Sequence, residues 1–338
     1  MVARFLYLSV FWLLSGAAIA QSDYLERPAV TDFIDQMQTE HAYDPQALRQ
    51  LFAQTAHRAD IIEKISKPAE RVWTWGRYKG HLVDDARIQA GIEFGRQHWS
   101  TLLAAEQEYG VAPEIVLAIL GIETRYGQIT GSYPVFESLV TLGFDYPPRA
   151  KFFRSELEQF LLLAREEGKD PLTLNGSYAG AMGYGQFISS SYRHYAVDFD
   201  DDGVRDIWQN PVDAIGSIAN YFRQHRWHGE HPRAIQVSLA TDAQIEFGTG
   251  LKLNQTVGSL REAGVSLPES LSDLDDGLAA RIYRLQYDDD TPDEYWVALE
   301  DFYVITRYNR SHLYAMAVHH IAERIAAGLA AETEQESS

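Results

Sequence analysis

Glu123 is the residue in this sequence best placed for acid–base chemistry. It follows an almost wholly apolar segment, residues 113–122, and precedes Thr124-Arg125-Tyr126-Gly127. A carboxyl group in apolar surroundings has its charged form disfavoured, so its pKa rises and it can hold a proton near neutral pH. Such a group can serve as a general acid. The same pattern also fits an ion pair with Arg125 or a cap on a neighbouring helix, and periodicity does not separate these alternatives.

A second candidate site is an acidic run in which every other residue is an aspartate. Asp198, Asp200 and Asp202 alternate, Gly203 follows at the sixth position, and the next residue, Val204, can offer its backbone carbonyl. Calcium takes oxygen ligands from alternate positions of a loop in which glycine permits a sharp turn. The run therefore predicts a structural calcium site, with a solvated acidic turn as the alternative.

The acidic run departs from an ordinary EF-hand at its twelfth position. Gln209 stands where a bidentate Glu is usual, and the nearest replacement carboxylates are Asp206 and Asp213. Asp213 lies in the first turn of a helix that Pro211 opens, which is a rigid position from which a carboxylate can close a longer loop.

A glycine-rich segment, residues 176–187, lies between the two candidate sites. Its glycines alternate with hydroxyl, amide and aromatic side chains, a composition that suits a saccharide with apolar ring faces and many polar groups. Its candidate contacts are Ser177, Met182, Gln186 and Phe187. A phosphate loop is excluded because the Gly-Lys-Ser/Thr ending is missing. A tight turn between helices is the alternative.

The elements that must position these residues are predicted to be mainly helical. Apolar residues recur at three- and four-residue steps over most of the chain, whereas residues 235–239, 282–287 and 295–299 alternate as in strands. The predicted helices cover two or three segments within 31–65, then 84–109, 113–123, 150–167, a short segment after 189, 211–222, 256–263 and 311–327. The expected fold is a helical protein with a small sheet.

Composition and charge narrow the function classes. The 338 residues carry a formal net charge of −19, which argues against nucleic-acid binding and against docking to an anionic membrane face. No nucleophile elbow, cysteine nucleophile or dinucleotide fingerprint is present, so no organic cofactor is expected. The histidine pairs His225/His228 and His319/His320 lack a third ligand pattern and are interpreted as surface or structural histidines.

The first twenty residues resemble a secretory signal. Arg4 is followed by an apolar stretch and by a small-residue cleavage site that ends at Ala20. The apolar stretch is shorter than the roughly 20 residues of a membrane span, so cleavage is favoured over a transmembrane anchor. Since the chain has no cysteine, neither a disulfide nor a lipid-carrying thiol is expected. The prediction is a soluble exported protein without stable membrane insertion.

Five segments, in this order, resemble the lytic murein transglycosylases of the B type. They are residues 123–127, 176–187, 196–199, 211–216 and 306–310. The resemblance runs from about Trp75 to Val318. It implies a mainly α (α+β) fold with a lysozyme-like helical catalytic core, an N-terminal helical region and a small β-containing subdomain. The implied activity is cleavage of the MurNAc to GlcNAc bond of peptidoglycan.

The resemblance also assigns roles to individual residues. Glu123 matches the family's single catalytic acid and base; the substrate's 2-acetamido group replaces a second carboxylate, and a 1,6-anhydro ring is formed. The residues that match the glycan groove are Ser177, Gln186, Tyr221, Tyr308, Tyr314, Tyr78 and Arg149, and those that match the calcium loop are Asp198, Asp200, Asp202, Val204 and Asp213. The chain departs from the family before its long helix, where Pro148-Arg149 replaces a pair of arginines.

The resemblance completes the expected organisation. The predicted regions are 1–20 (signal peptide), 21–80 (N-terminal helical region), 81–231 (catalytic core with the loop 198–213), 232–300 (β-containing subdomain), 301–329 (segment and helix returning to the core) and 330–338 (disordered tail). The expected setting is the periplasm, with peptidoglycan strands as substrate, other cell-wall enzymes as candidate partners, and a monomeric state. The competing hypotheses are a non-catalytic peptidoglycan-binding or scaffold protein and a hydrolytic, lysozyme-type muramidase.

Overall fold

The structure is a computed structural model of the 338-residue chain, and it describes residues 23–67, 73–248 and 250–336. The predicted signal segment, residues 1–20, lies outside the described residues. Across the ranges that are described, no helix combines the length and the apolar character needed to cross a membrane.

The described residues divide into two compact units between His57 and Arg58, and the predicted extent of the N-terminal helical region, 21–80, stays a prediction. The described part of the first unit contains the 3-10 helix η1 (Asp23–Glu26) and the helices α1 (Pro28–His41) and α2 (Pro45–Ala53). Phe33 and Phe52 pack edge to face in its interior, with ring centroids 6.2 Å apart.

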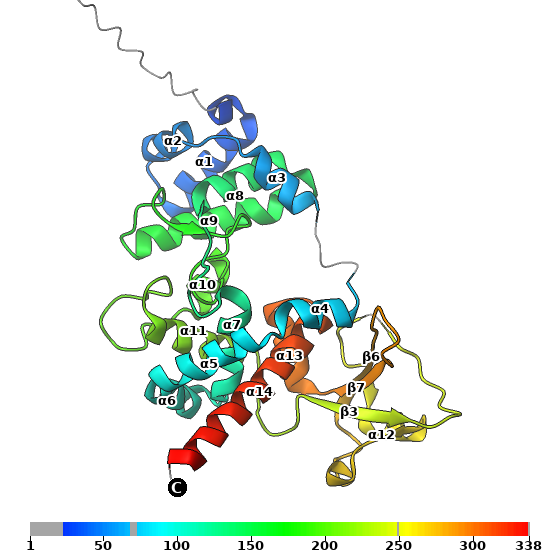
Figure 1. The fold of residues 1–338 in the computed structure, drawn as a ribbon. Helices are drawn as coiled ribbons and strands as arrows, with labels where there is room; N and C mark the ends of the chain where they lie inside the picture. The colour runs from blue at the N-terminus through cyan, green and yellow to red at the C-terminus, as the bar shows by residue number, and fades with distance from the viewer. Residues whose placement is uncertain (1–22, 68–72, 249, 337–338) are drawn as a thin grey trace, which may run out of the picture. The chain divides into compact units, whose positions relative to one another are not determined.

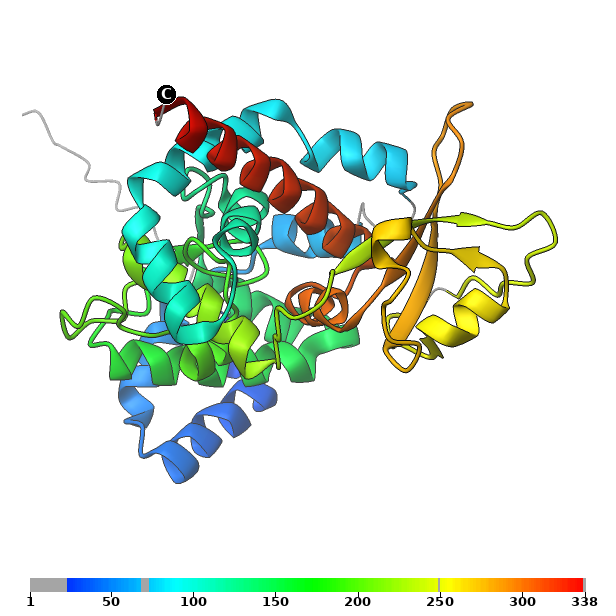
Figure 2. The same ribbon diagram turned by 90° about the horizontal axis from the view of Figure 1, so that it is seen from below.

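The second unit is a helical body with a small sheet attached, as the sequence predicted (Figures 1 and 2). Its helices are α3 (Ala59–Ser66), α4 (Trp75–Leu82), α5 (Asp85–Gln97), α6 (Trp99–Tyr109), α7 (Pro113–Thr124), α8 (Val135–Asp145), η3 (Pro147–Arg149), α9 (Ala150–Glu166), α10 (Ser189–Tyr195), α11 (Pro211–Gln224), α12 (Val257–Glu262), η4 (Glu269–Leu271), α13 (Glu300–Tyr308) and α14 (His312–Glu336). The short strands β1 (Tyr133–Pro134) and β2 (Asn175–Gly176) pair antiparallel.

The central helix is α7, and its sequence explains its position. Pro113 occupies the first turn, where its missing N–H is no loss, and most residues from Ile115 to Gly121 are buried. A helix that is apolar on all sides is covered on all sides. Here α5, α6, α11 and α14 all contact α7 (Figure 1). Glu123 is therefore held at the end of an element that cannot shift without moving the core.

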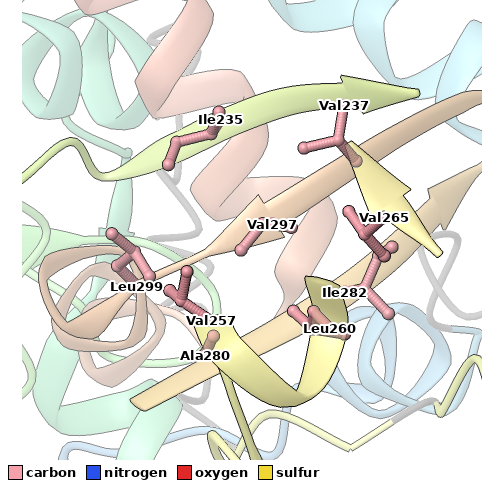
Figure 3. Packing of buried hydrophobic residues seen from close by; sticks show 9 residues of the cluster. All are labelled: Ile235, Val237, Val257, Leu260, Val265, Ala280, Ile282, Val297 and Leu299. Carbon is pink, nitrogen blue, oxygen red and sulfur yellow. The ribbon is translucent and has the colours of Figure 1, made fainter. Parts of the chain in front are cut away.

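The sheet has the strand order β4-β6-β7-β3-β5, and all its pairings are antiparallel. Its strands are β3 (Ala234–Leu239), β4 (Gln255–Thr256), β5 (Val265–Ser266), β6 (Ala279–Leu285) and β7 (Glu294–Ala298). Figure 3 shows one face, where Ile235, Ile282 and Val297 pack with Leu260 of α12. The period-two pattern in the sequence predicted this buried face correctly.

The opposite face of the sheet packs on α14 through aromatic rings. Tyr283 of β6 stacks on His312, with centroids 5.0 Å apart and planes at 6°. Trp296 of β7 meets His319 and His320 edge to face, each at 5.3 Å. His319 is only 7% exposed. The adjacent histidines are thus part of this interface, which agrees with the structural interpretation and not with a surface position.

Four features of the structure differ from the predicted helices. The helix predicted over 84–109 is broken at His98 into α5 and α6, and α4, which contains Tyr78, was not among the predicted helices. α8, which is buried over most of its length, was not predicted. The last helix continues to Glu336 instead of ending near Ala327. Gly328 lies inside this helix and permits close packing on α5, since a Cβ there would lie 2.2 Å from Ile92.

Candidate active site

Glu123 lies in the last turn of α7 and its side chain is half-buried. The phenol of Tyr314, from α14, donates a hydrogen bond to Oε1 of Glu123 over 2.6 Å. Burial raises the pKa of Tyr314 well above its usual value, and the charge of Glu123 raises it further. Tyr314 therefore remains a neutral hydroxyl and a hydrogen-bond donor throughout the range in which a carboxyl group titrates.

The turn that follows Glu123 has an unusual backbone. Arg125 and Tyr126 adopt left-handed φ values of 49° and 60°, and Gly127 follows with 84°. For a residue other than glycine this conformation costs roughly 1–2 kcal/mol, so neighbouring contacts must hold the turn. Nη2 of Arg125 lies 3.3 Å from a carboxylate oxygen of Asp84, which gives its charge a partner other than Glu123.

Tyr126 and Arg87 hold this turn, and the sequence analysis did not predict either role. The Tyr126 hydroxyl donates to the carbonyl of Arg87 over 3.0 Å, and Nε of Arg87 donates to the carbonyl of Gly121 over 3.0 Å. Both side chains are buried. The available signal was the pair Gly91 and Gly121, where an added Cβ would lie 2.3 and 2.5 Å from the Tyr126 oxygen.

Tyrosines from two further helices, α13 and α11, lie in the same region, and the resemblance predicted both of them as groove residues. The Tyr308 hydroxyl, at the end of α13, donates to the carbonyl of Gly185 in the glycine-rich segment over 2.5 Å. Tyr221 of α11 donates to the carbonyl of Arg307 over 2.7 Å, and its ring lies 4.8 Å from that of Tyr308. Burial raises the pKa of Tyr308 well above its usual value, and the charge of Glu123 contributes.

Two further predicted groove residues lie in different surroundings. Tyr78 of α4 is 2% exposed, and it contributes to the raised pKa of Tyr314, so the two phenols are close. Arg149 is exposed at η3, with its guanidinium 4.2 Å from the ring centroid of Phe152. Arg149 is thus available to a ligand at the start of α9.

The glycine-rich segment, residues 176–187, folds back on itself. Met182 and Phe187 exchange two backbone hydrogen bonds of 2.9 Å each, and Oγ of Ser177 accepts a bond from the amide of Ala181 over 3.0 Å. Met182 is fully buried and Phe187 is 3% exposed. These two side chains pack inside the segment, and their predicted contact with a ligand stays a prediction. Ser177 is half-buried.

Gln186 is held in place by its own amide group. Its Nε2 donates to the carbonyls of Thr130 and Gly183, both over 3.0 Å, and its backbone has a φ of 49°. Both amide hydrogens thus bind the protein. What Gln186 can offer a ligand is its side-chain carbonyl oxygen.

The acidic run brings three carboxylates together. Oxygen atoms of Asp198, Asp200 and Asp202 lie within 4.8 Å of one another, and this donor set suits a hard cation such as calcium. Val204, beside them, is exposed, and its amide donates to Asp202 over 2.8 Å. The three alternating aspartates therefore fit the predicted calcium ion.

Asp213 has a different place from the three alternating aspartates. Its side chain is fully buried, and its two oxygens accept bonds from the amides of Phe199 and Asp206 over 2.8 and 2.7 Å. Burial raises the pKa of this carboxyl, although the two amide bonds oppose the rise. Asp213 thus fixes the loop 198–213 at Phe199 and at Asp206, and its predicted role as a calcium ligand stays a prediction.

Known proteins match this sequence over most of its length. A family model described as a transglycosylase SLT domain matches residues 26–323. The chain is 40% identical over 315 residues to membrane-bound lytic murein transglycosylase B of Escherichia coli (strain K12), which covers 90% of this chain and 84% of that protein.

Two solved structures extend the comparison. Soluble lytic transglycosylase SltB1 from Pseudomonas aeruginosa is 46% identical, with a TM-score of 0.84 over 89% of this chain and 99% of that one. The Escherichia coli lytic transglycosylase Slt35 in complex with calcium is 38% identical, with a TM-score of 0.82 over 92% of this chain and 96% of that one.

Proposed function

The chain belongs to the transglycosylase SLT family and is a peptidoglycan lytic transglycosylase, and we propose that Glu123 is its single catalytic acid and base. The observation that carries this proposal is the hydrogen bond of 2.6 Å from Tyr314 to Glu123 at the end of a buried apolar helix. This contact fixes one carboxyl group beside the glycine-rich segment. The role of the carboxyl group comes from the family, which segments 123–127 and 176–187 resemble.

The proposed reaction needs one group that gives and then takes a proton. Glu123, protonated, donates its proton to the oxygen that links MurNAc to GlcNAc as that bond breaks. The substrate's 2-acetamido group stabilises the positive charge that develops on the sugar carbon. The ionised Glu123 then removes the proton of the MurNAc 6-hydroxyl while its oxygen attacks that carbon. The product is a 1,6-anhydro end, and Glu123 is protonated again.

The tyrosines suit both halves of this cycle. A neutral phenol at 2.6 Å stabilises the carboxylate that exists between the two proton transfers, because a hydrogen bond to an ionised group is stronger than one between neutral groups. The same phenol, being neutral, places no second negative charge beside Glu123. We assign Ser177, Gln186, Tyr78, Tyr221, Tyr308, Tyr314 and Arg149 to the glycan groove.

The test of the reaction is the substitution Glu123→Gln, which keeps the shape of the side chain and removes its proton chemistry. We expect release of fragments from purified sacculi to fall by about 1,000-fold or more. Glu114→Gln is the matched control, since Glu114 lies in the first turn of the same helix and its carboxylate is 3.7 Å from Arg233. Release at the wild-type rate by Glu123→Gln would sink the assignment.

Mass spectrometry of the products separates the competing reactions. Anhydro ends are lighter than the reducing ends of a lysozyme-type hydrolase by the mass of one water. Binding to sacculi without any release would identify a non-catalytic binding or scaffold protein instead.

The acidic loop is proposed to bind calcium through Asp198, Asp200 and Asp202, the carbonyl of Val204 and Asp213, with a structural role. The cluster of carboxylates supports this, as does the calcium complex of the 38% identical relative. When bound, the ion would neutralise these carboxylates and stiffen the loop. The proposed setting is the periplasm, where the exported chain would act as a monomer alongside other cell-wall enzymes.

Calcium should raise the melting temperature, by an amount that corresponds to about 2.7 kcal/mol when free calcium is 100-fold above its dissociation constant. Asp200→Asn should remove this effect. Asp201→Asn is the control, because Asp201 neighbours the cluster without belonging to it, and its φ of 57° is one that asparagine accepts. Equal responses of the two variants would argue against the proposed ligands.

A further inference from the structure

Thr124, the residue after Glu123, uses its hydroxyl outside its own helix. Its Oγ1 donates to the carbonyl of Tyr184 over 2.9 Å, whereas the carbonyl of Leu120, the usual partner one turn back, is 3.4 Å away. A hydroxyl has one hydrogen, so the shorter contact decides where it goes. Thr124 is 1% exposed, and the bond it makes to the glycine-rich segment is shielded from water.

The same oxygen also fixes the turn after Glu123. It accepts a hydrogen bond from the amide of Gly127 over 2.9 Å, while the carbonyl of Thr124 accepts one from the amide of Ile129 over 2.9 Å. Gly127 packs directly on Tyr184, because a Cβ there would lie 2.1 Å from its ring. The Thr124 hydroxyl thus connects two segments: it accepts a hydrogen bond from the strained turn and donates one to the glycine-rich segment.

The connection continues into the acidic loop. The amide of Tyr184 donates to the carbonyl of Ile207 over 2.9 Å, and a Cβ on Gly183 would lie 2.4 Å from that same carbonyl oxygen. Next to Ile207, the amide of Asp206 is held by Asp213 over 2.7 Å. The peptide of Tyr184 therefore receives Thr124 at its carbonyl and reaches the acidic loop through its amide.

We propose that Thr124 is a positioning residue for the transglycosylase reaction: its hydroxyl fixes the end of α7 against Tyr184, and through Tyr184 against the acidic loop, so that Glu123 keeps its place relative to the glycan groove. Thr124 touches neither the reacting atoms nor solvent. It acts on Glu123 by fixing the backbone on which the carboxyl group stands. This inference rests on the proposed role of Glu123.

Kinetics of Thr124→Val and Thr124→Ser on sacculi test the proposal. Valine keeps the shape and loses the hydroxyl, and a small displacement of a catalytic group lowers the rate by about 10- to 100-fold. We expect a kcat loss of that size for Thr124→Val, with a KM within about twofold of wild type. Thr124→Ser should recover most of kcat. Thr55→Val is the control, since Thr55 is 3% exposed and its hydroxyl donates only locally, to the carbonyl of Leu51 in the last turn of α2 over 2.9 Å.

Hydrogen exchange tests the connection without using activity. In the wild type and in Thr124→Ser, calcium should slow amide exchange both in residues 180–187 and in residues 125–129. In Thr124→Val, calcium should slow exchange only in residues 180–187, because the hydroxyl that links the two segments is gone.

Several outcomes would overturn the proposal. They are an unchanged kcat in Thr124→Val, an equal loss in Thr124→Ser, a loss confined to KM, or calcium protection of residues 125–129 that survives in Thr124→Val. Glu123→Gln is measured in the same series. An inactive Glu123→Gln beside a fully active Thr124→Val would reject the role of Thr124 alone, whereas an active Glu123→Gln would reject the proposed function itself.

Discussion

Tyr314→Phe isolates the hydrogen bond that Glu123 accepts. The change removes one oxygen atom, 2.6 Å from Oε1, and keeps the buried ring. A hydrogen bond to a charged group is worth about 1.5–3 kcal/mol, and the half-buried position of Glu123 favours the lower end of that range. Since one pH unit corresponds to about 1.4 kcal/mol, the loss is equivalent to about one pH unit.

The sign of the effect follows from the state that the phenol stabilises. Tyr314 donates to the ionised carboxylate, so its removal lets Glu123 keep its proton to a higher pH. The first step needs the protonated acid. The alkaline limb of the kcat/KM profile should therefore move upward by about one pH unit, while the rate at the optimum falls because the carboxylate between the two steps loses support.

A profile of kcat/KM on sacculi from about pH 4 to pH 9 measures this shift. Tyr308→Phe is the matched control: it removes a phenol from the same region, but that phenol donates to the carbonyl of Gly185 and not to Glu123. Tyr308→Phe should lower the rate without moving the limb. A fixed limb in Tyr314→Phe, or equal shifts in both variants, would refute the reasoning.

Two further predictions concern stability. Gly127→Ala should lower the free energy of unfolding by about 3 kcal/mol, because the residue has a left-handed φ and its Cβ would lie 2.1 Å from the Tyr184 ring. Gly110→Ala, which has a similar φ but open space around the Cβ, should lower it by about 1 kcal/mol. Equal urea midpoints for the two variants would contradict this prediction. Burial lowers the pKa of His319 to about 3 and of His320 to about 4. In the unfolded chain both histidines take up a proton below about pH 6.5, whereas in the folded chain they stay neutral to a lower pH. The free energy of unfolding therefore decreases as the pH falls from 6.5 toward 4, by about 1–2 kcal/mol for each histidine at pH 5. The urea midpoints at pH 7 and pH 5 should differ less in His320→Gln than in the wild type. An equal difference in the two proteins would contradict this role of His320.

Elements with a strong period were predictable from the sequence. The alternation in residues 235–239 identified β3, and the apolar run that begins at Pro113 identified α7. The break at His98 was not predictable, because neither glycine nor proline marks it. α8 is buried like α7, but its Val140, Thr141 and Gly143 lower the helix propensity, whereas proline at the first position marks the start of α7.

The candidate site divides along the same line. Asp198, Asp200 and Asp202 are neighbours in sequence, and their spacing alone brought their oxygens together. Tyr314 is 191 positions from Glu123, a separation at which no local pattern can pair two residues, and only the family resemblance indicated it. The composition of the glycine-rich segment did not reveal that Met182 points inward, because that depends on the backbone bonds it exchanges with Phe187.

The sheet supports the active site indirectly, through α14, since the hydrogen bond to Glu123 comes from Tyr314 of that helix. Tyr314 and His319 lie five positions apart on α14, and successive residues of a helix are rotated by about 100°. The two side chains therefore point to different sides of the helix, Tyr314 toward Glu123 and His319 toward Trp296. Because α14 packs on α5 and α7 as well as on the sheet through His312 and His319, its rotation is restricted from two sides, and the Tyr314 hydroxyl stays 2.6 Å from the carboxylate.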